Sequence, residues 1–210
     1  MAKSTTRFVC QECGTAMGKW SGQCASCGQW NTLSEEQSSQ GLPKGLKGGK
    51  GTKICFVGLT GEFAEPPRMA TRMLEFDRVC GGGMVPGSAI LIGGDPGIGK
   101  STLVLQVVGC LAASSDCTYI SGEESIDQVR MRANRLGLGD APIRLAAASS
   151  VRDILTTLES GPTSGVVVID SIQTMFVDSL ESAPGTVAQV RTSAQELIRL
   201  AKRRGFCLLL

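Results

Sequence analysis

Residues Gly94-Asp95-Pro96-Gly97-Ile98-Gly99-Lys100-Ser101 have the spacing G-x-x-x-x-G-K-[ST], which is typical of a nucleoside-triphosphate P-loop. The apolar run Ala89-Ile90-Leu91-Ile92 precedes them as a buried strand would, and residues 102–108 continue as a helix would. Glycines let the backbone turn tightly and aim its N–H groups inward, while the following helix presents its positive end to phosphates. The sequence therefore predicts a phosphate-binding loop between a strand and a helix. The alternative is a glycine-rich turn before an ordinary helix.

The P-loop pattern gives each of its residues an expected part in binding. The expected nucleotide-binding residues are Gly94, Asp95, Pro96, Gly97, Ile98, Gly99, Lys100, Ser101 and Thr102. Within this set, the Lys100 ammonium would reach the β- and γ-phosphates. The Ser101 hydroxyl would bind Mg²⁺, with Thr102 close behind it. The pattern therefore predicts a nucleoside triphosphate bound together with Mg²⁺.

The composition bounds the class of protein. With 210 residues, 42% of them hydrophobic and 19% charged, the chain can form one sizeable domain and a small one. No apolar run approaches the ~20 residues needed to cross a bilayer, and no apolar stretch behind residues 1–7 could act as a signal peptide. We therefore expect a cytoplasmic protein with no membrane partner. Its nine cysteines are then expected to serve metal binding or burial and not disulfides.

Two C-x-x-C pairs lie near the N-terminus. Cys10 and Cys13 form the first pair, Cys24 and Cys27 form the second, and a glycine follows each pair. Four thiolates in this pattern match a closed, tetrahedral, structural Zn²⁺ site. Because so short a segment cannot bury enough surface to fold alone, metal binding would supply its folding free energy. The alternative, a redox-active C-x-x-C, would explain one pair and leave the other unaccounted for.

The N-terminal quarter of the chain is basic. Residues 1–53 carry seven Lys or Arg against three Glu, a net charge of +4, whereas residues 54–210 carry fourteen basic against sixteen acidic residues, a net charge of −2. Lysines recur at positions 44, 47, 50 and 53 in a Ser-, Gln- and Gly-rich stretch that predicts a flexible linker. The simplest expected partner for this segment is nucleic acid, and the alternative is a solvated linker without a partner. The only two tryptophans, Trp20 and Trp30, precede the linker, where packing in a small core is favoured over stacking on bases.

Carboxylates follow two predicted strands. The strand at residues 117–121 is followed by Glu123 and Glu124, and the β-branched strand at residues 165–170 ends in Asp170. The carboxyl ends of such strands face the nucleotide crevice of an α/β sheet. One of the two glutamates could activate the water that attacks the γ-phosphate, or both could simply favour the N-terminus of the next helix. Asp170 is placed like a Walker B aspartate, which supports the Mg²⁺ shell.

Two further helices are predicted from apolar periodicity. Residues 126–136 place Val129, Ala133 and Leu136 on one face, which leaves the arginines of this helix largely outward. Residues 186–204 predict an amphipathic helix, with a buried side formed by Val187, Val190, Ala194, Leu197, Ile198 and Ala201. The loop before it, residues 176–185, contains acidic residues and no basic residue, which argues against direct contact of that loop with DNA.

Residues 76–101, which include Gly81-Gly82-Gly83, resemble the start of the nucleotide-binding core of the RecA superfamily. With the four-cysteine ribbon ahead of this core, the chain closely resembles the bacterial RadA (Sms) family over essentially its whole length. The resemblance implies an α/β fold: a RecA-like P-loop core with a mostly parallel central sheet flanked by helices, preceded by a small zinc ribbon with four cysteine ligands. It maps the catalytic glutamate onto Glu123, with Glu124 as the fallback. It also makes Gln173 a candidate γ-phosphate sensor.

The resemblance also implies an activity and partners. The implied activity is a DNA-dependent ATPase of recombinational DNA repair that uses ATP, Mg²⁺ and Zn²⁺ and moves along, or branch-migrates, recombination intermediates. The implied partners are single-stranded or branched DNA, further subunits in a homo-oligomeric ring, and recombinases or helicases. We expect a ribbon at residues 1–30, a linker at 31–53 and an ATPase domain at 54–210 that is truncated at its C-terminus. The alternatives are a KaiC-like ATP-driven regulator of other proteins and a catalytically incomplete fragment that binds ATP and DNA.

Overall fold

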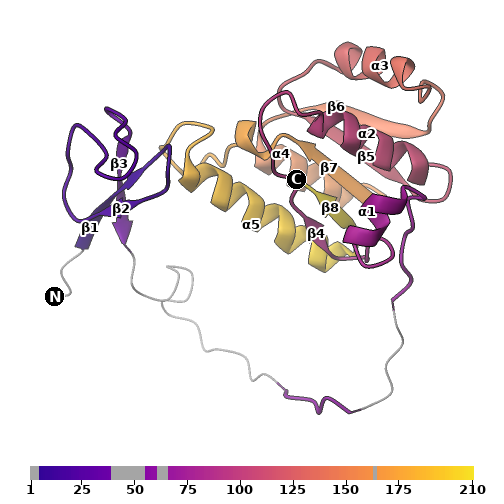
Figure 1. The fold of residues 1–210 in the computed structure, drawn as a ribbon. Helices are drawn as coiled ribbons and strands as arrows, with labels where there is room; N and C mark the ends of the chain where they lie inside the picture. The colour runs from indigo at the N-terminus through magenta and orange to yellow at the C-terminus, as the bar shows by residue number, and fades with distance from the viewer. Residues whose placement is uncertain (1–4, 39–54, 61–65, 163–164) are drawn as a thin grey trace. The chain divides into compact units, whose positions relative to one another are not determined.

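The computed structural model describes residues 5–38, 55–60, 66–162 and 165–210 (Figure 1). The chain divides into two compact units, Met1–Phe63 and Ala64–Leu210, and each is considered by itself. The lysines at positions 44, 47, 50 and 53, with most of the predicted linker, lie outside the described residues. Every helix in the described part of the chain is too short or too polar to span a membrane.

The first unit contains a three-stranded antiparallel sheet with the strand order β2-β1-β3. Its strands are β1 (Thr5–Cys10), β2 (Ala16–Met17) and β3 (Leu33–Ser38). Strand β3 pairs with the whole of β1, from Thr5 opposite Ser38 to Cys10 opposite Leu33. The sheet of the ribbon therefore extends past residue 30, where we expected the ribbon to end. A polar strand that resembles linker sequence completes the sheet.

Both tryptophans lie on the surface of the ribbon. The side chain of Trp20 is 59% exposed and that of Trp30 is 67% exposed. The buried side chains of the described ribbon are Val9, Cys10, Cys24 and Leu33. The expectation that the tryptophans pack the small core is therefore wrong, because two of the cysteines and two aliphatic residues already fill it.

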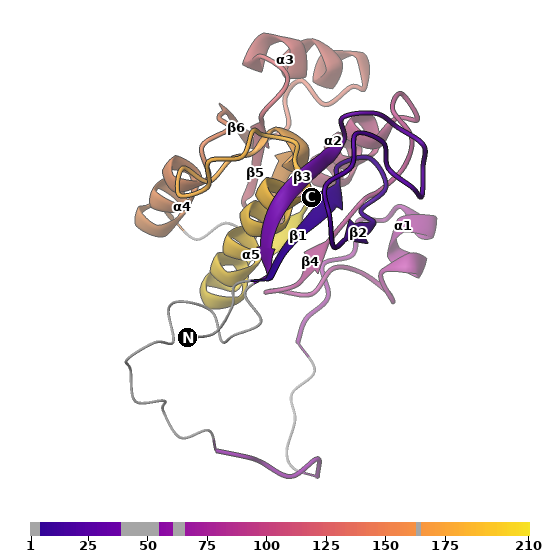
Figure 2. The ribbon, with the colours of Figure 1, turned by 90° about the vertical axis from the view of Figure 1, so that its left-hand side faces the viewer.

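The second unit is built on a five-stranded parallel sheet with the strand order β4-β8-β7-β5-β6. The strands are β4 (Ala89–Ile90), β5 (Cys117–Ser121), β6 (Ile143–Ala147), β7 (Val166–Asp170) and β8 (Cys207–Leu209). The helices are α1 (Leu74–Val79), α2 (Lys100–Leu111), α3 (Ile126–Arg135), α4 (Val151–Ser160), the 3-10 helix η2 (Ile172–Thr174) and α5 (Val187–Arg204). Figures 1 and 2 show α2 and α3 on one face of the sheet and α4 and α5 on the other. The predicted RecA-like α/β arrangement is confirmed.

Strand β7 is buried on both faces, as its β-branched sequence predicts. Val166 and Val168 belong to the apolar cluster that includes the buried side of α2. Val167 and Ile169 belong to the cluster formed with α4 and α5. Because successive side chains of a strand point to opposite faces, this single strand joins both halves of the core. The fully buried part of β7 therefore ends just before Asp170, which contacts Ser101 at the start of α2.

The buried side of α5 contains two polar residues that apolar spacing does not predict. Leu197 and Ala201 are buried as expected, whereas Val187, Val190, Ala194 and Ile198 are only partly buried. The other buried residues of this helix are Gln189, Ser193 and Leu200. Val190, Ala194 and Ile198 still pack against the core cluster, so apolar spacing located this side of the helix and missed Gln189, Ser193 and Leu200.

Gln189 is buried because it holds the loop that precedes α5. Its Oε1 accepts a hydrogen bond from the backbone N–H of Val177 at 2.8 Å. Its Nε2 lies 3.2 Å, 3.3 Å and 2.9 Å from the carbonyl oxygens of Val177, Leu180 and Ser182. A buried amide with these partners is satisfied, and it fixes an irregular segment that has no ladder of its own. The acidic loop after η2 is thus tied to α5.

The last residue of Gly81-Gly82-Gly83 must be glycine for a steric reason. Gly83 has φ of 132°, and a Cβ placed on it would lie 2.8 Å from the carbonyl oxygen of Met69. The neighbouring Met84 exchanges two backbone hydrogen bonds with Met69, at 2.8 Å and 3.0 Å. Only glycine permits this close approach, which fixes the segment leading into β4.

Candidate functional site

The P-loop lies between β4 and α2, as predicted. Strand β4 ends at Ile90, earlier than the expected residue 92, although the backbone N–H of Ile92 still donates to the carbonyl oxygen of Leu210 at 2.9 Å. Residues 93–99 are exposed, and α2 begins directly after them at Lys100. The loop therefore stands free at the carboxyl end of the sheet, where ligands bind in open α/β sheets.

The start of α2 differs from the starts of the three long helices that follow it. Ser125, Ser150 and Thr186 cap α3, α4 and α5 with side-chain oxygens that accept backbone N–H groups. The N-cap of α2 is Gly99, and no side chain caps it. Its first backbone N–H groups are thus left for an external acceptor, and the helix dipole favours an anionic one.

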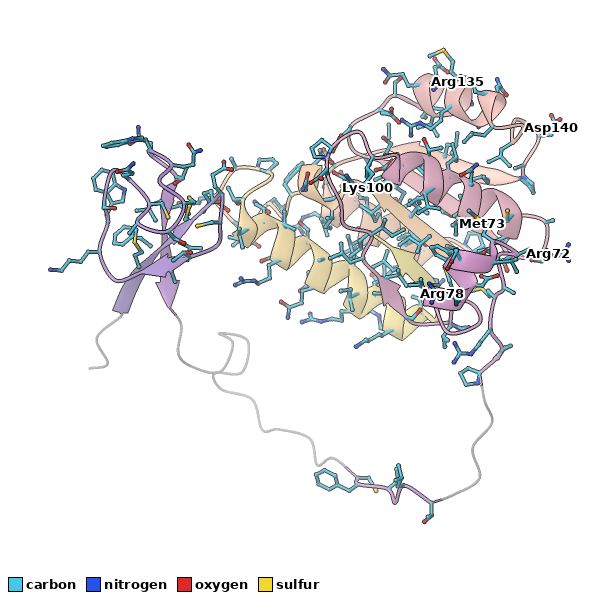
Figure 3. All side chains as sticks on the ribbon, in the orientation of Figure 1. Arg72, Met73, Arg78, Lys100, Arg135 and Asp140 are labelled. Atoms are coloured by element: carbon cyan, nitrogen blue, oxygen red, sulfur yellow. The ribbon has the colours of Figure 1, made fainter. Side chains whose placement is uncertain are left out.

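Lys100 strengthens this preference for an anion. It stands in the first turn of α2 (Figure 3), the positive end of the helix dipole, where a cation is unfavourable on its own. Its Nζ donates to the carbonyl oxygens of Gly94 and Asp95, at 2.8 Å and 2.9 Å. The ammonium is thus folded over the loop that would surround the phosphates. Ser101 and Thr102 follow in the same turn of α2, and both are partly buried.

Asp170 lies next to Ser101, although the two residues are far apart in the sequence. The Ser101 hydroxyl donates to Oδ1 of Asp170 at 3.0 Å. The hydroxyl of Tyr119, from the adjacent strand β5, donates to Oδ2 of the same carboxylate. Burial, with the hydrogen bond to Asp170, raises the pKa of Tyr119 well above its ordinary value, so this hydroxyl stays protonated. The predicted Mg²⁺-associated pair, Ser101 and Asp170, is therefore brought together.

Glu123 reaches the same edge of the sheet from the end of β5. Its carboxylate is exposed, and its Oε1 accepts a hydrogen bond from the hydroxyl of Ser171 at 2.6 Å. The turn is close to η2: a Cβ on Gly122 would lie 2.1 Å from Oγ1 of Thr174 and 2.6 Å from Cε of Met175. Glycine at position 122 thus allows the Glu123 turn and the segment after Asp170 to lie together.

Glu124 is directed elsewhere. Its carboxylate pairs with Arg132 of α3, and these two side chains are 29% and 16% exposed. One oxygen of Glu124 and one terminal nitrogen of Arg132 are buried without a further partner in the described structure. The expectation that the arginines of this helix point outward is therefore wrong for Arg132, although Arg130 is exposed. A carboxylate held in such a pair is poorly placed to take up a proton from water, which favours Glu123 over its neighbour.

A cleft of about 360 Å³ adjoins the P-loop and the end of β7. Its polar lining includes Lys100, Asp170, Ser171 and Gln173, and the rest is mostly aliphatic. Gln173 is exposed in η2. The structure thus places the predicted sensor beside the P-loop lysine and the strand-end aspartate.

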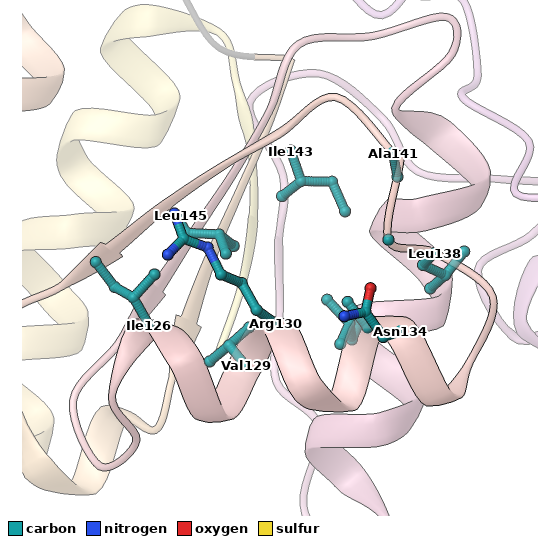
Figure 4. A pocket seen from close by; sticks show the side chains of 11 residues that line it. Ile126, Val129, Arg130, Asn134, Leu138, Ala141, Ile143 and Leu145 are labelled. Atoms are coloured by element: carbon teal, nitrogen blue, oxygen red, sulfur yellow. The ribbon is translucent and has the colours of Figure 1, made fainter.

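A second hollow lies between α3, α2 and β6 (Figure 4). Its lining is mostly aliphatic, with Arg130 and Asn134 as its polar side chains. None of the predicted nucleotide-binding residues lines it. This hollow is therefore separate from the nucleotide site.

The four ribbon cysteines converge on one point. Their sulfur atoms all lie within 4.8 Å of one another. The Sγ atoms of Cys10 and Cys27 are 3.6 Å apart, as are those of Cys13 and Cys24. Sulfurs bound at about 2.3 Å to one tetrahedral ion lie roughly 3.8 Å apart, so the cluster fits Zn²⁺.

The protonation of these thiols also fits a metal site. A hydrogen bond with the Thr32 side chain lowers the pKa of Cys10 to about 6. A backbone hydrogen bond from Gln29 lowers the pKa of Cys27. Desolvation and the neighbouring thiols outweigh this effect and raise the pKa of Cys27 to about 12. Closely spaced thiols disfavour one another's ionised form, and a bound cation would reverse this effect.

Sequence reasoning missed two contacts of the candidate site, Tyr119 and Ser171, and the inward position of Arg132 beside Glu124. The only signal for Tyr119 is that it is the single tyrosine of the chain and lies in a predicted buried strand beside the strand of Asp170. Ser171 follows the strand-end aspartate directly. Nothing in the spacing distinguishes Arg132 from the other arginines of its helix. Their roles depend on strand order and register, which one sequence does not contain.

Two family models match separate parts of the chain. An ATPase model described as KaiC matches residues 69–157, which include the P-loop, α2 and Glu123. A model described as a rubredoxin metal binding domain matches residues 8–35, which include all four clustered cysteines. An ATPase core of this kind takes ATP and Mg²⁺, and the four-cysteine ribbon takes Zn²⁺.

Curated relatives match the chain from end to end. The DNA repair protein RadA of Brucella abortus is 47% identical over 100% of this chain and 47% of its own length. RadA of Pseudomonas aeruginosa is 46% identical over 100% of this chain and 47% of its own, and RadA of Bacillus subtilis is 43% identical over 98% and 46%. The chain spans about half the length of these relatives. A zinc ribbon, a P-loop core and this identity over the whole chain together show that the chain belongs to the RadA family.

Proposed function

We propose that this chain contains the nucleotide-hydrolysing part of a DNA-dependent ATPase that acts in recombinational DNA repair. The single observation that carries the proposal is that Lys100 and the Ser101–Asp170 pair stand at the uncapped start of α2, while Ser171, directly after Asp170, holds Glu123. The names of the relatives supply the context, since they are DNA repair proteins. Coupling of hydrolysis to movement on DNA or to branch migration is part of the proposal.

The binding half of the mechanism rests on α2 and the loop before it. The backbone from Gly94 to Gly99 would surround the phosphates, and the Lys100 ammonium would move from the loop carbonyls to the phosphate oxygens. Ser101 and Asp170 would hold Mg²⁺, which when bound neutralises phosphate charge. The hydrogen bond from Ser101 to Asp170 leaves the lone pairs of the Ser101 oxygen free for a cation.

The hydrolytic half rests on Glu123. Its carboxylate is exposed, and the hydroxyl of Ser171, a residue that lines the cleft, donates to one of its oxygens at 2.6 Å. The other oxygen would accept the proton of the attacking water, which makes Glu123 the general base. Gln173 of the same edge would contact the γ-phosphate as a sensor.

The test compares two neighbouring carboxylates. Glu123→Gln should lower ATP turnover by about 10²–10⁴-fold with nucleotide affinity nearly unchanged, because it removes only the base. Glu124→Gln is the matched control, since Arg132 already occupies that carboxylate. Its turnover per folded molecule should stay near that of the parent chain, with folding checked by thermal denaturation. Equal turnover in Glu123→Gln and the parent would refute the role of Glu123.

DNA binding is proposed for the basic N-terminal unit. Trp20 and Trp30 are exposed aromatic rings on the ribbon, and such rings stack on unpaired bases, at about 1–3 kcal/mol per base. Removing both by Trp20→Ala and Trp30→Ala should weaken binding of a labelled single-stranded oligonucleotide by at least about tenfold at low salt. Phe56→Ala is the matched control, because Phe56 is an exposed aromatic residue of the same unit that lies outside the ribbon.

The second candidate function is an ATP-driven regulator of other proteins. It is favoured by the family model described as KaiC, which matches the core and not the ribbon. In the core, Asp178 of the loop after η2 is paired with Arg152, at 2.6 Å and 3.0 Å, and this loop presents no basic side chain to a phosphate. The two candidates differ in one measurement. ATP turnover that single-stranded DNA stimulates at low salt supports the DNA motor, and turnover indifferent to DNA supports the regulator.

We also propose that the site is completed by a second subunit in a homo-oligomeric ring. The exposure of residues 93–99, Glu123 and Gln173 supports this, because a bound triphosphate would face solvent in one copy of the chain. Light scattering with and without ATP and Mg²⁺ tests the assembly. Nucleotide-dependent growth in mass supports a ring, and a constant monomer mass in the presence of bound nucleotide would contradict it.

A further inference from the structure

Tyr119 is the only tyrosine of the chain, and its side chain is 0% exposed. It lies in β5 opposite Val168 of β7, and two residues further along these parallel strands Ser121 lies opposite Asp170. Alternate residues of a strand share a face, so Tyr119, Val168 and Asp170 all point to the face that α2 covers. The Tyr119 side chain thus lies next to Asp170 on the sheet face that α2 covers.

The two oxygens of Asp170 have different donors from different elements. Oδ1 accepts from Ser101 of α2 at 3.0 Å, and Oδ2 accepts from the hydroxyl of Tyr119 of β5. A carboxylate with one donor can still turn about its own bond, whereas a second donor on the other oxygen fixes its plane. The buried aromatic ring cannot follow such a turn, because it is packed in the apolar cluster with α2. Tyr119 therefore fixes the orientation in which Asp170 meets Ser101.

Packing alone does not account for a tyrosine at this position. Phenylalanine would fill the same apolar volume without a hydroxyl that needs a partner, and a buried hydroxyl left unpaired costs about 1–3 kcal/mol. Here the hydroxyl has one acceptor, and that acceptor is the predicted Mg²⁺-associated carboxylate. Groups that orient the residues around a metal ion commonly change metal affinity by about 10–100-fold when they are removed.

We propose that Tyr119 is a positioning residue of the Mg²⁺ site: it holds Oδ2 of Asp170 so that Oδ1 keeps Ser101 oriented toward the cation. The inference rests on the proposed function, in which the P-loop binds a nucleotide together with Mg²⁺. It adds a residue from β5 to a site otherwise built from α2 and β7. Its consequence is specific: the hydroxyl affects the Mg²⁺-dependent part of nucleotide binding and leaves the metal-free part unchanged.

The test is a Mg²⁺ titration of the binding of a fluorescent ATP analogue to the whole chain. In Tyr119→Phe, the Mg²⁺ concentration needed for half-maximal tightening of binding should rise by about tenfold. Affinity for the analogue in excess EDTA should stay within about twofold of the parent, since phosphate contacts do not use the tyrosine. Ser88→Ala is the matched control, because it removes a hydroxyl that contacts Cys207 at the other end of the sheet.

A double-mutant cycle tests whether Tyr119 affects the Mg²⁺ requirement through Asp170. Tyr119→Phe should have no further effect on the Mg²⁺ requirement in a chain that already contains Asp170→Ala. A Tyr119→Phe chain with the parent's Mg²⁺ requirement, or a shift that persists in the Asp170→Ala background, would overturn the inference while leaving the proposed function intact. A parent chain that binds the analogue equally well with and without Mg²⁺ would overturn the proposed function and this inference with it.

Discussion

The ribbon and the core are stabilised in opposite ways. In the described ribbon, the buried side chains are two of the four clustered cysteines and two aliphatic residues, whereas in the core two apolar clusters cover both faces of a parallel sheet. Each fully buried aliphatic side chain contributes roughly 1.5–3 kcal/mol, so the core can fold on burial and the ribbon cannot. One unit should therefore depend on an ion that the other does not need.

The largest expected effect is the loss of the ribbon without its metal. Cys24→Ser should abolish stoichiometric Zn²⁺ binding and unfold the ribbon, because structural zinc contributes about 10–16 kcal/mol in small metal-dependent modules. Hydrogen exchange should show lost protection in β1 and β3 and unchanged protection in β5 and β7. Cys55→Ser is the control, since Cys55 is an exposed cysteine outside the cluster. Equal loss of protection in both units would show that they do not fold independently.

A second variant reverses the comparison, because it should disable the core and spare the ribbon. Lys100→Ala should weaken ATP binding by about 100-fold or more, roughly 3 kcal/mol, since it removes the ammonium at the phosphate loop. Thermal stability should hardly change, because Lys100 bonds only to two carbonyl oxygens of the loop. Calorimetry measures the affinity, and Lys202→Ala, an exposed lysine in the last turn of α5, is the control. Unchanged ATP affinity in Lys100→Ala would refute the P-loop assignment.

A pair of glycine variants tests how tightly each unit is packed. Gly122→Ala should lower stability by about 1–3 kcal/mol and disturb the site, because its new methyl group would overlap Thr174 and Met175. Gly18→Ala in the ribbon should have almost no effect, since a Cβ there meets nothing within 4 Å. Thermal denaturation compares the two. A stable Gly122→Ala chain would mean that η2 can move away from the end of β5.

The smallest expected effect concerns one surface charge pair of the core. The Arg152 guanidinium lowers the pKa of the exposed Asp178 carboxyl. A depressed carboxyl pKa stabilises the folded state above the ordinary pKa of the group, and this contribution disappears as pH falls through the folded value. Arg152→Gln should therefore lower Tm by at most about 2 °C at pH 7 and by less below about pH 3. A Tm difference between Arg152→Gln and the parent that grows on acidification would contradict the ion-pair explanation. The hydrogen-exchange protection of the ribbon should be the same in both chains at pH 7.

Local sequence patterns predicted the parts of the fold that have strong local signals. The P-loop spacing located the start of α2, and the β-branched run located β7 with Asp170 at its end. The C-x-x-C pairs located the thiol cluster because ligand spacing is itself local. These patterns also predicted that Glu123 and Asp170 lie at one edge of the sheet, since parallel strands end on the same side.

The errors came from side chains whose environment is decided by distant residues. Apolar periodicity excluded Gln189 from the buried face of α5, but the carbonyl groups of a loop make that amide a core residue. Arg132 was expected outward, and the position of Glu124 turns it inward. The tryptophans were expected inward, but the ribbon has no apolar interior large enough to bury them. Each error concerns a partner supplied by another element.

The missing cap of α2 has a thermodynamic consequence for the whole core. A nucleotide whose phosphates accept the first N–H groups of α2 would occupy the place that Ser125, Ser150 and Thr186 occupy in the other long helices. The ligand would then act as a removable structural element, and at 100 times its Kd it would add about 2.7 kcal/mol to the free energy of unfolding. Hydrolysis and release would take that contribution away at every cycle. Bound and empty forms of the core should thus differ in rigidity at the point where β4, α2 and β7 meet.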